Sequence, residues 1–211
     1  MFDFNPLDLI AGIPGLIIAM VIHEYAHARV AVALGDRTPM LMGRLTLNPA
    51  AHIDPVGLIM LFLVRFGWAK PVIIDPRNFR KPRRDDILVS LAGPAANLVT
   101  AFFALVALLV LKSTMGHLSF GVYQVFQLII IYNINFAIFN LIPLLPIPPL
   151  DGSHVLMQLL PPRMAYRYAR LERYSFLILI ALIMTPVLSM IFIPLQRLIW
   201  QIFVLLLMPF F

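Results

Sequence analysis

The feature that most constrains this chain is a run of 25 residues without a charge, from Ile87 to Leu111. About 20 consecutive apolar residues are enough for a helix to cross the hydrocarbon core of a bilayer. A second charge-free run, from Leu118 to Leu150, has 33 residues, and its last eight include four prolines. Because proline removes a backbone donor and breaks helices, we expect this segment to cross the membrane and then to unwind.

Apolar segments near both ends of the chain complete the predicted set of spans. Leu9 begins a first span, and Tyr174 to Gln196 has the length of a further one, with Pro186 as a kink. The tail from Leu198 is short, and its sequence leaves open whether it crosses or lies at the surface. Only 12% of the residues are charged, against about one quarter in a soluble domain. We therefore predict one all-α polytopic membrane domain over residues 1–211, with a three-span core at about 9–160 and one or two spans within 174–211.

The segment between the first two spans, Gly35 to Asp86, has a different pattern. Gly43 to Gly57 and Trp68 to Pro76 alternate apolar and polar residues and are punctuated by proline and glycine. This pattern favours short strands in a β-hairpin. The apolar piece Gly57 to Val64 is too short to cross, so we interpret it as an interfacial or re-entrant segment.

The distribution of basic residues predicts the orientation in the membrane. Nine of the sixteen Lys and Arg residues lie in Gly35 to Asp86, and four more arginines lie in Pro161 to Arg173. Short loops rich in Lys and Arg stay in the cytoplasm. We therefore expect a multi-pass protein of the cell membrane with its N-terminus outside and both basic loops inside. The positive charge is explained by this topology and by anionic lipid, and not by nucleic acid.

The stretch "VIHEYAHARV" places ionisable residues in an apolar segment, where each is costly without a partner. In a helix, His23 and His27 lie one turn apart on the same face, and Glu24 is next to His23. This is the His-Glu-x-x-His pattern, in which two imidazoles bind zinc and the glutamate acts as general base. The chain has only two glutamates, and one of them occupies the required position. The alternative is a helix end whose polar side chains merely reach interfacial water.

A catalytic zinc needs a third protein ligand. The chain has no cysteine, so this ligand is His, Asp or Glu. Asp151 is the best candidate, because it follows the proline-broken end of the third span, at the depth expected for His23 and His27. Asp151 is also suited to capping a following helix, a role compatible with ligation. His154 and His52 compete for the third position, or would orient a ligand from outside the coordination shell.

Three motifs together carry a resemblance to a known family. They are His-Glu-Tyr-Ala-His on the first span, "LAGPAANL" on the second and "NLIPLLPIPPLDG" after the third. With them, the chain resembles the site-2 protease family of intramembrane zinc metalloproteases over about Leu9 to Leu160. The stretch "NPAAHIDPVG" is similar to the compact prokaryotic branch of that family. Some members carry PDZ or CBS domains, for which this chain has no room.

The resemblance implies an activity and a set of site residues. It implies one zinc ion per chain, held by His23, His27 and Asp151, with Glu24 as the general base for cleaving a membrane-embedded peptide bond. Asn97 matches the asparagine of the family's Gly-Pro-x-x-Asn pattern, and Asn140 matches the one before Leu-Asp-Gly. Either amide would bind an unwound substrate backbone or stabilise the oxyanion. Interhelical hydrogen bonding explains both amides equally well.

The expected partners are transmembrane protein substrates and the lipid bilayer, together with a second copy of the chain or a regulatory membrane protein. A substrate helix would enter laterally and unwind near the site, and the edge of the predicted hairpin would pair with its backbone. Water would arrive from the cytoplasm. The alternatives are a membrane metal transporter, for which no internal repeat is visible, and another membrane zinc hydrolase acting on a lipid or a prenylated peptide.

Overall fold

The computed structural model describes residues 6–64, 67–142 and 150–210. The long helices are α1 (Pro6–Leu34), α4 (Pro82–Met115), α5 (Phe120–Leu141) and α9 (Val187–Leu207). The shorter α-helices are α2 (Thr38–Leu41), α3 (Pro55–Val64), α6 (Asp151–Leu159), α7 (Pro162–Ala169) and α8 (Ser175–Ile183). Three 3₁₀ helices are η1 (Pro49–Ala51), η2 (Pro76–Asn78) and η3 (Arg170–Tyr174).

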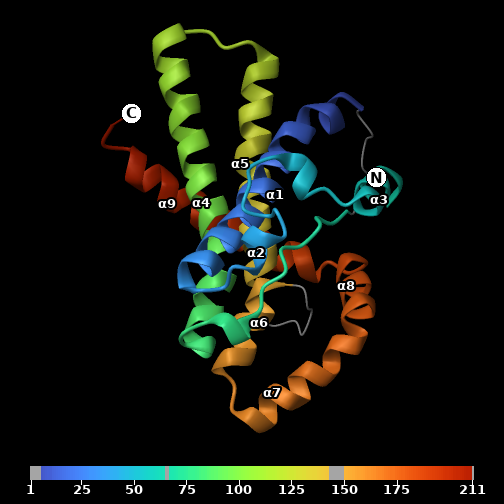
Figure 1. The fold of residues 1–211 in the computed structure, drawn as a ribbon. Coiled ribbons are helices and arrows are strands. Elements are labelled where there is room, and N and C mark those ends of the chain that lie inside the picture. The colour runs from blue at the N-terminus through green and yellow to red at the C-terminus, as the bar shows by residue number, and fades with distance from the viewer. Residues whose placement is uncertain (1–5, 65–66, 143–149, 211) are drawn as a thin grey trace.

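Three helices form the core of the molecule. Figure 1 shows α4 and α5 side by side, with α1 lying against both. By length and apolar composition, four helical segments suit a membrane span: Ala11–Leu34, Pro82–Met115, Phe120–Leu141 and Val187–Leu207. The turn between α4 and α5 is short because Gly116 ends α4 at a φ of 68° and Ser119 caps α5 by accepting a hydrogen bond from the Val122 amide.

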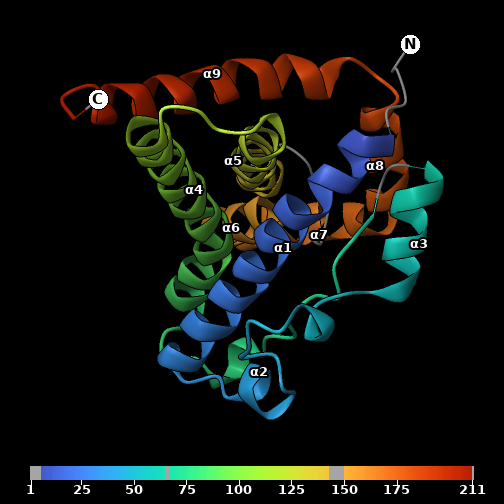
Figure 2. The same cartoon turned by 90° about the horizontal axis from the view of Figure 1, so that it is seen from above.

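The largest buried apolar cluster joins α4, α5 and α9. Leu105 and Leu108 of α4 meet Ile130 and Ile134 of α5, and Phe203 of α9 closes the cluster. Figure 2 shows α9 running across α4 and α5. Helix α9 therefore packs mainly on α5 and α4.

The prediction of a β-hairpin between the first two spans is wrong. In the described part of residues 35–81 there is no strand, and pairing is limited to one isolated antiparallel bridge between Ile53 and Ala69. Side chains occupy the backbone donors that a ladder would need: Asn48 caps η1, Asp54 accepts from the Val56 and Gly57 amides, and Asp75 caps η2. The piece Gly57 to Val64 is helical, as part of α3.

The C-terminal region also differs from the prediction. The expected span Tyr174 to Gln196 is interrupted at Met184 to Pro186. Helix α8, before this break, has nine residues, and of the two helices only α9, after the break, is long enough to cross a membrane. Proline ends the helical hydrogen bonding here instead of kinking one continuous helix. The predicted unwinding after the third span falls on residues 143–149, which lie outside the described residues.

Helix α6 is held where the first turns of α4 and the end of α5 meet. The guanidinium of Arg83 donates to the Gln158 carbonyl at 2.6 Å, and the Gln158 amide donates to Asp86 at 2.7 Å. At the other end of α6, a Cβ on Gly152 would lie 2.9 Å from the Leu141 backbone, so only glycine allows this approach. These contacts fix the position of Asp151, the first residue of α6. Figure 1 shows α6 and α7 at the end of the molecule opposite the α4–α5 turn.

Candidate metal centre

Helix α1 presents two histidines to the interior of the core. His23 and His27 are both 5% exposed, and their rings pack edge to face. Opposite them, α4 comes so close that a Cβ on Gly93 would lie 2.4 Å from His27 Nε2 and 2.6 Å from His23 Cε1. The one-turn spacing of the histidines and the missing side chain at Gly93 together make room for two imidazoles between the helices.

Hydrogen bonds from the Nδ1 atoms set the tautomers of both rings. His27 Nδ1 lies 2.8 Å from the Val89 carbonyl oxygen, which can only accept, so Nδ1 carries the proton. His23 Nδ1 donates in the same way to Asn97 Oδ1 at 2.7 Å. In the neutral rings each Nε2 offers a lone pair, and the two Nε2 atoms lie 3.0 Å apart. A shared cation, either a proton or a metal ion, satisfies two acceptors placed this close together.

Asp151 supplies negative charge at the same place. Its Oδ2 lies 3.2 Å from His23 Nε2, and its Oδ1 lies 3.3 Å from His27 Nε2. Oδ2 is buried without a hydrogen-bond partner. Asp151 does not cap α6 through its side chain; it is the first helical residue, and its carboxylate faces the histidines. A buried carboxylate oxygen without a donor is costly unless a cation satisfies it.

The donor set fits a zinc ion. Within the described part of the chain, the group of His, Asp and Glu able to hold a metal is His23, His27 and Asp151, whose ligand atoms all lie within 4.8 Å of one another. Two neutral imidazoles and one carboxylate are a known donor set for catalytic zinc, which leaves a fourth position open. The hydrogen bonds at both Nδ1 atoms are those that orient metal-binding histidines.

Glu24 is half-buried and contacts a segment far away in the sequence. Its Oε2 accepts a hydrogen bond from the Val72 amide at 2.9 Å. The segment 70–75, which carries Val72, is anchored at its end by Asp36, whose Oδ2 accepts from the Asp75 amide at 2.8 Å. The structure therefore holds the carboxylate of the predicted general base by a backbone donor that the sequence pattern did not reveal.

Of the other predicted site residues, all in the described part of the chain, only Asn97 forms a hydrogen bond with the group of His23, His27 and Asp151. Asn97 is fully buried and contacts His23 directly, whereas the Asn140 amide donates to the Phe136 carbonyl one turn before it. His154 is half-buried in α6 and is not one of the three grouped residues. His52 is fully buried, and its Nε2 donates to the Thr46 carbonyl at 2.8 Å. It is also outside the group, so the structure brings together Asp151, and not His154 or His52, with the two histidines.

Comparison with known proteins agrees with this geometry. The sequence model of Peptidase family M50 matches residues 11–186. The chain belongs to this family. It is 38% identical over 198 residues to "Putative zinc metalloprotease YwhC" of Bacillus subtilis, covering 92% of this chain and 89% of the relative. It is 33% identical over 183 residues to "Putative zinc metalloprotease Rip2" of Mycolicibacterium smegmatis, covering 84% of this chain and 68% of the relative. No solved structure matches.

Membership of family M50, the site-2 proteases, together with four long apolar helices identifies a membrane metalloprotease. Three contacts in this M50 peptidase were not predicted from its sequence. Gly93 belongs to the Gly-Pro-x-x-Asn pattern, but the pattern does not reveal that it faces both imidazoles. The Val72 amide carries no sequence signal at all. Asn133, which contacts Asn97, did carry one, because it is a polar residue in the charge-free third span just as Asn140 is.

Proposed function

We propose that this M50 peptidase is an intramembrane zinc endopeptidase that hydrolyses a peptide bond within or near a transmembrane segment of its substrate proteins. The observation that carries the proposal is the convergence of two imidazole lone pairs and an unpaired carboxylate oxygen between helices, beside Glu24. Bound by His23, His27 and Asp151, zinc would supply a Lewis acid that polarises the scissile carbonyl and acidifies the attacking water.

The residues of the chain perform the remaining steps. Glu24 removes the proton from the attacking water and delivers it to the leaving amine, so that one carboxylate acts first as base and then as acid. The Val72 amide donates a hydrogen bond to the Glu24 carboxylate and so restricts the orientation of this carboxylate before the reaction. Because substrate backbone is shielded inside a helix by its own hydrogen bonds, the substrate segment unwinds before it reaches the site.

The depth of the site supports water entry from the end of the molecule that carries the basic segments. The imidazoles lie beside Val89 and Gly93, near the start of α4, and Asp151 follows the end of α5. That is also the end where Arg83 binds the last turn of α6. We propose that this end faces the cytoplasm, with the N-terminus outside.

One experiment tests the proposal. Wild type and Glu24→Gln are purified and incubated with transmembrane peptides and with short unfolded peptides of the same sequence, and the zinc content of both proteins is measured. We expect about one zinc per chain in both, and cleavage by wild type that falls by several orders of magnitude in Glu24→Gln. Equal cleavage by the two proteins would reject Glu24 as the base. Metal movement across vesicles by Glu24→Gln, without cleavage by wild type, would favour the transporter.

A further inference from the structure

Asn133 lies in the middle of α5 and is fully buried, although none of the steps proposed above uses it. Its Nδ2 donates to the Ile129 carbonyl at 2.8 Å. Because a backbone carbonyl can only accept, this contact fixes which side of the amide is nitrogen. The oxygen of Asn133 therefore faces the opposite way, toward Asn97 of α4.

Asn97 continues the chain of hydrogen bonds toward the metal centre. Its Nδ2 donates to the Ala19 carbonyl at 2.8 Å and to Asn133 Oδ1 at 2.9 Å, which uses both of its N–H groups. Its oxygen is then left to accept from His23 Nδ1 at 2.7 Å. Three side chains from α5, α4 and α1 thus form one continuous chain of donors and acceptors, in which each amide nitrogen and each amide oxygen has at least one partner.

We propose that Asn133 is a positioning residue for His23, acting through Asn97. It holds the Asn97 oxygen toward the imidazole, so that the His23 proton stays on Nδ1 and the Nε2 lone pair points at Asp151. Without Asn133, one of the two acceptors that hold Asn97 Nδ2 is lost, and a turned amide would present donors to His23. A donor at that place favours the tautomer with the proton on Nε2, which cannot bind a metal through that atom.

His27 provides an internal contrast. Its Nδ1 donates to a backbone carbonyl, that of Val89, which no side-chain change removes. Loss of Asn133 should therefore disturb one imidazole and leave the other in place. The expected result is a weakened and distorted metal site, not an absent one. This inference rests on the proposed zinc centre, but not on proteolysis.

The test measures metal binding on the purified full chain. The variants are Asn133→Leu, Asn97→Leu, their combination and Asn135→Leu. Asn135 is the matched control, because it is an asparagine of the same helix whose side chain contacts Gln196 of α9 and not the site. The zinc dissociation constant is determined by chelator competition, the cobalt-substituted proteins are compared by visible absorption, and the unfolding temperature is recorded for each.

We expect Asn133→Leu to weaken zinc binding about 10- to 100-fold and to change the cobalt spectrum, whereas Asn135→Leu changes neither. In the Asn97→Leu background, adding Asn133→Leu should have little further effect, because both residues act through one contact. Asn133→Asp should restore most of the affinity, since it keeps an oxygen for Asn97 and, protonated in its buried surroundings, a donor for Ile129. If Asn133→Leu does not fold, Asn133→Ala, which fits the same space, is measured in its place.

Wild-type zinc affinity and cobalt spectrum in the Asn133 variant would overturn the inference, and so would fully additive losses in the double variant. A wild-type protein that binds zinc but cleaves no peptide would refute the proposed function and leave the positioning role standing. A wild-type protein that binds no zinc would overturn both.

Discussion

At the scale of single residues, the candidate metal centre depends on the lack of a side chain at Gly93 as well as on the ligands themselves. The two imidazoles occupy the place where a side chain of α4 would otherwise stand, and Gly93 leaves it open. Interiors are packed closely enough that one added methyl group must displace its neighbours. The histidines cannot move far, because Val89 and Asn97 hold their Nδ1 atoms.

Gly93→Ala should therefore damage the metal centre. The new methyl group would lie less than 3 Å from both imidazoles, so we expect zinc affinity and cleavage to fall by about 100-fold. Zinc titration and a peptide cleavage assay measure the two effects. Gly121→Ala is the control, since its Cβ would meet no atom within 4 Å. Unchanged zinc binding in Gly93→Ala would mean that the helices separate without cost.

At the scale of elements, the extended segment 70–75 links two carboxylates at different places along α1 and the turn after it. Val72 donates to Glu24, and Asp75 donates to Asp36. Asp36 is fully buried and also accepts from the Thr38 amide and hydroxyl and from the Asn78 side chain. The buried carboxylate of Asp36 thus holds the end of the segment at Asp75. Nearer its start, the segment places the Val72 amide where it donates to Glu24, the predicted general base.

Val72→Pro removes that donor without touching a metal ligand. A hydrogen bond to a charged group contributes about 1.5 to 3 kcal/mol, so we expect kcat to fall about tenfold or more while zinc content stays the same. Ile73→Pro is the matched control, because Ile73 is the next residue in the segment and is more than half exposed. Equal activity of the two variants would show that the Val72 contact does not serve Glu24.

Asp36→Ala should loosen the whole segment. Burial raises the pKa of the Asp36 carboxyl, but the donors of Thr38, Asp75 and Asn78 outweigh it, and the pKa lies below its ordinary value of 3.8. The pKa of Asp36 is lower in the folded protein than in the unfolded chain. The charged carboxylate therefore stabilises the fold at pH values above the unfolded-state pKa, and this stabilisation is lost as the pH falls through the folded-state pKa. Wild type should therefore unfold at a higher temperature than Asp36→Ala near neutral pH, with the gap narrowing in acid. A difference in unfolding temperature that stays the same from neutral to acidic pH would contradict this role of Asp36. Asp75→Ala, which removes the ion pair with the exposed Arg77 and the cap of η2 but no fully buried carboxylate, should lower the unfolding temperature less.

The sequence predicts local geometry and chemically distinctive side chains such as Asp151 well, and long-range contacts of the backbone poorly. His23, Glu24 and His27 form a pattern within one helical turn, so their relation follows from helix geometry alone. The hairpin was predicted from alternation, but capping side chains took the backbone donors that a ladder requires. The Val72 contact joins residues 48 positions apart through a backbone amide, which leaves no trace in residue identity.

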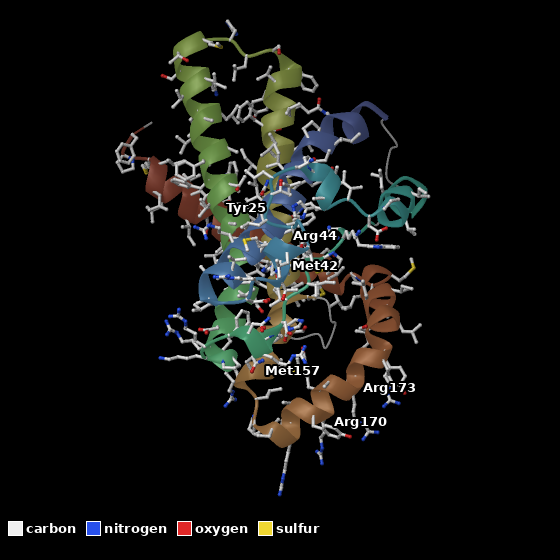
Figure 3. The ribbon with its side chains drawn as sticks, in the orientation of Figure 1. Tyr25, Met42, Arg44, Met157, Arg170 and Arg173 are labelled. Carbon is white, nitrogen blue, oxygen red and sulfur yellow. The ribbon has the colours of Figure 1, made fainter. Side chains whose placement is uncertain are left out.

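At the scale of the whole molecule, several basic residues lie at the end opposite the α4–α5 turn. Arg83 contacts α6 there, and Figure 3 shows Arg170 and Arg173 projecting from η3, at the end where α7 lies. The α4–α5 turn at the opposite end has Lys112 as its nearest basic residue. Because basic segments stay in the cytoplasm, this asymmetry predicts that the metal centre opens toward the cytoplasmic side.

The chain has no cysteine, so single introduced thiols report their side of the membrane without background. Arg170→Cys and Ser113→Cys both change exposed residues, at opposite ends of the molecule. In intact cells, a membrane-impermeant thiol reagent should label the Ser113 variant alone, and in inverted vesicles it should label the Arg170 variant alone. Unchanged zinc content in both variants controls for folding. The reverse pattern would place the basic segments outside, and water would then reach Glu24 from the outer face, because Asp151 and the start of α4 lie at the basic end.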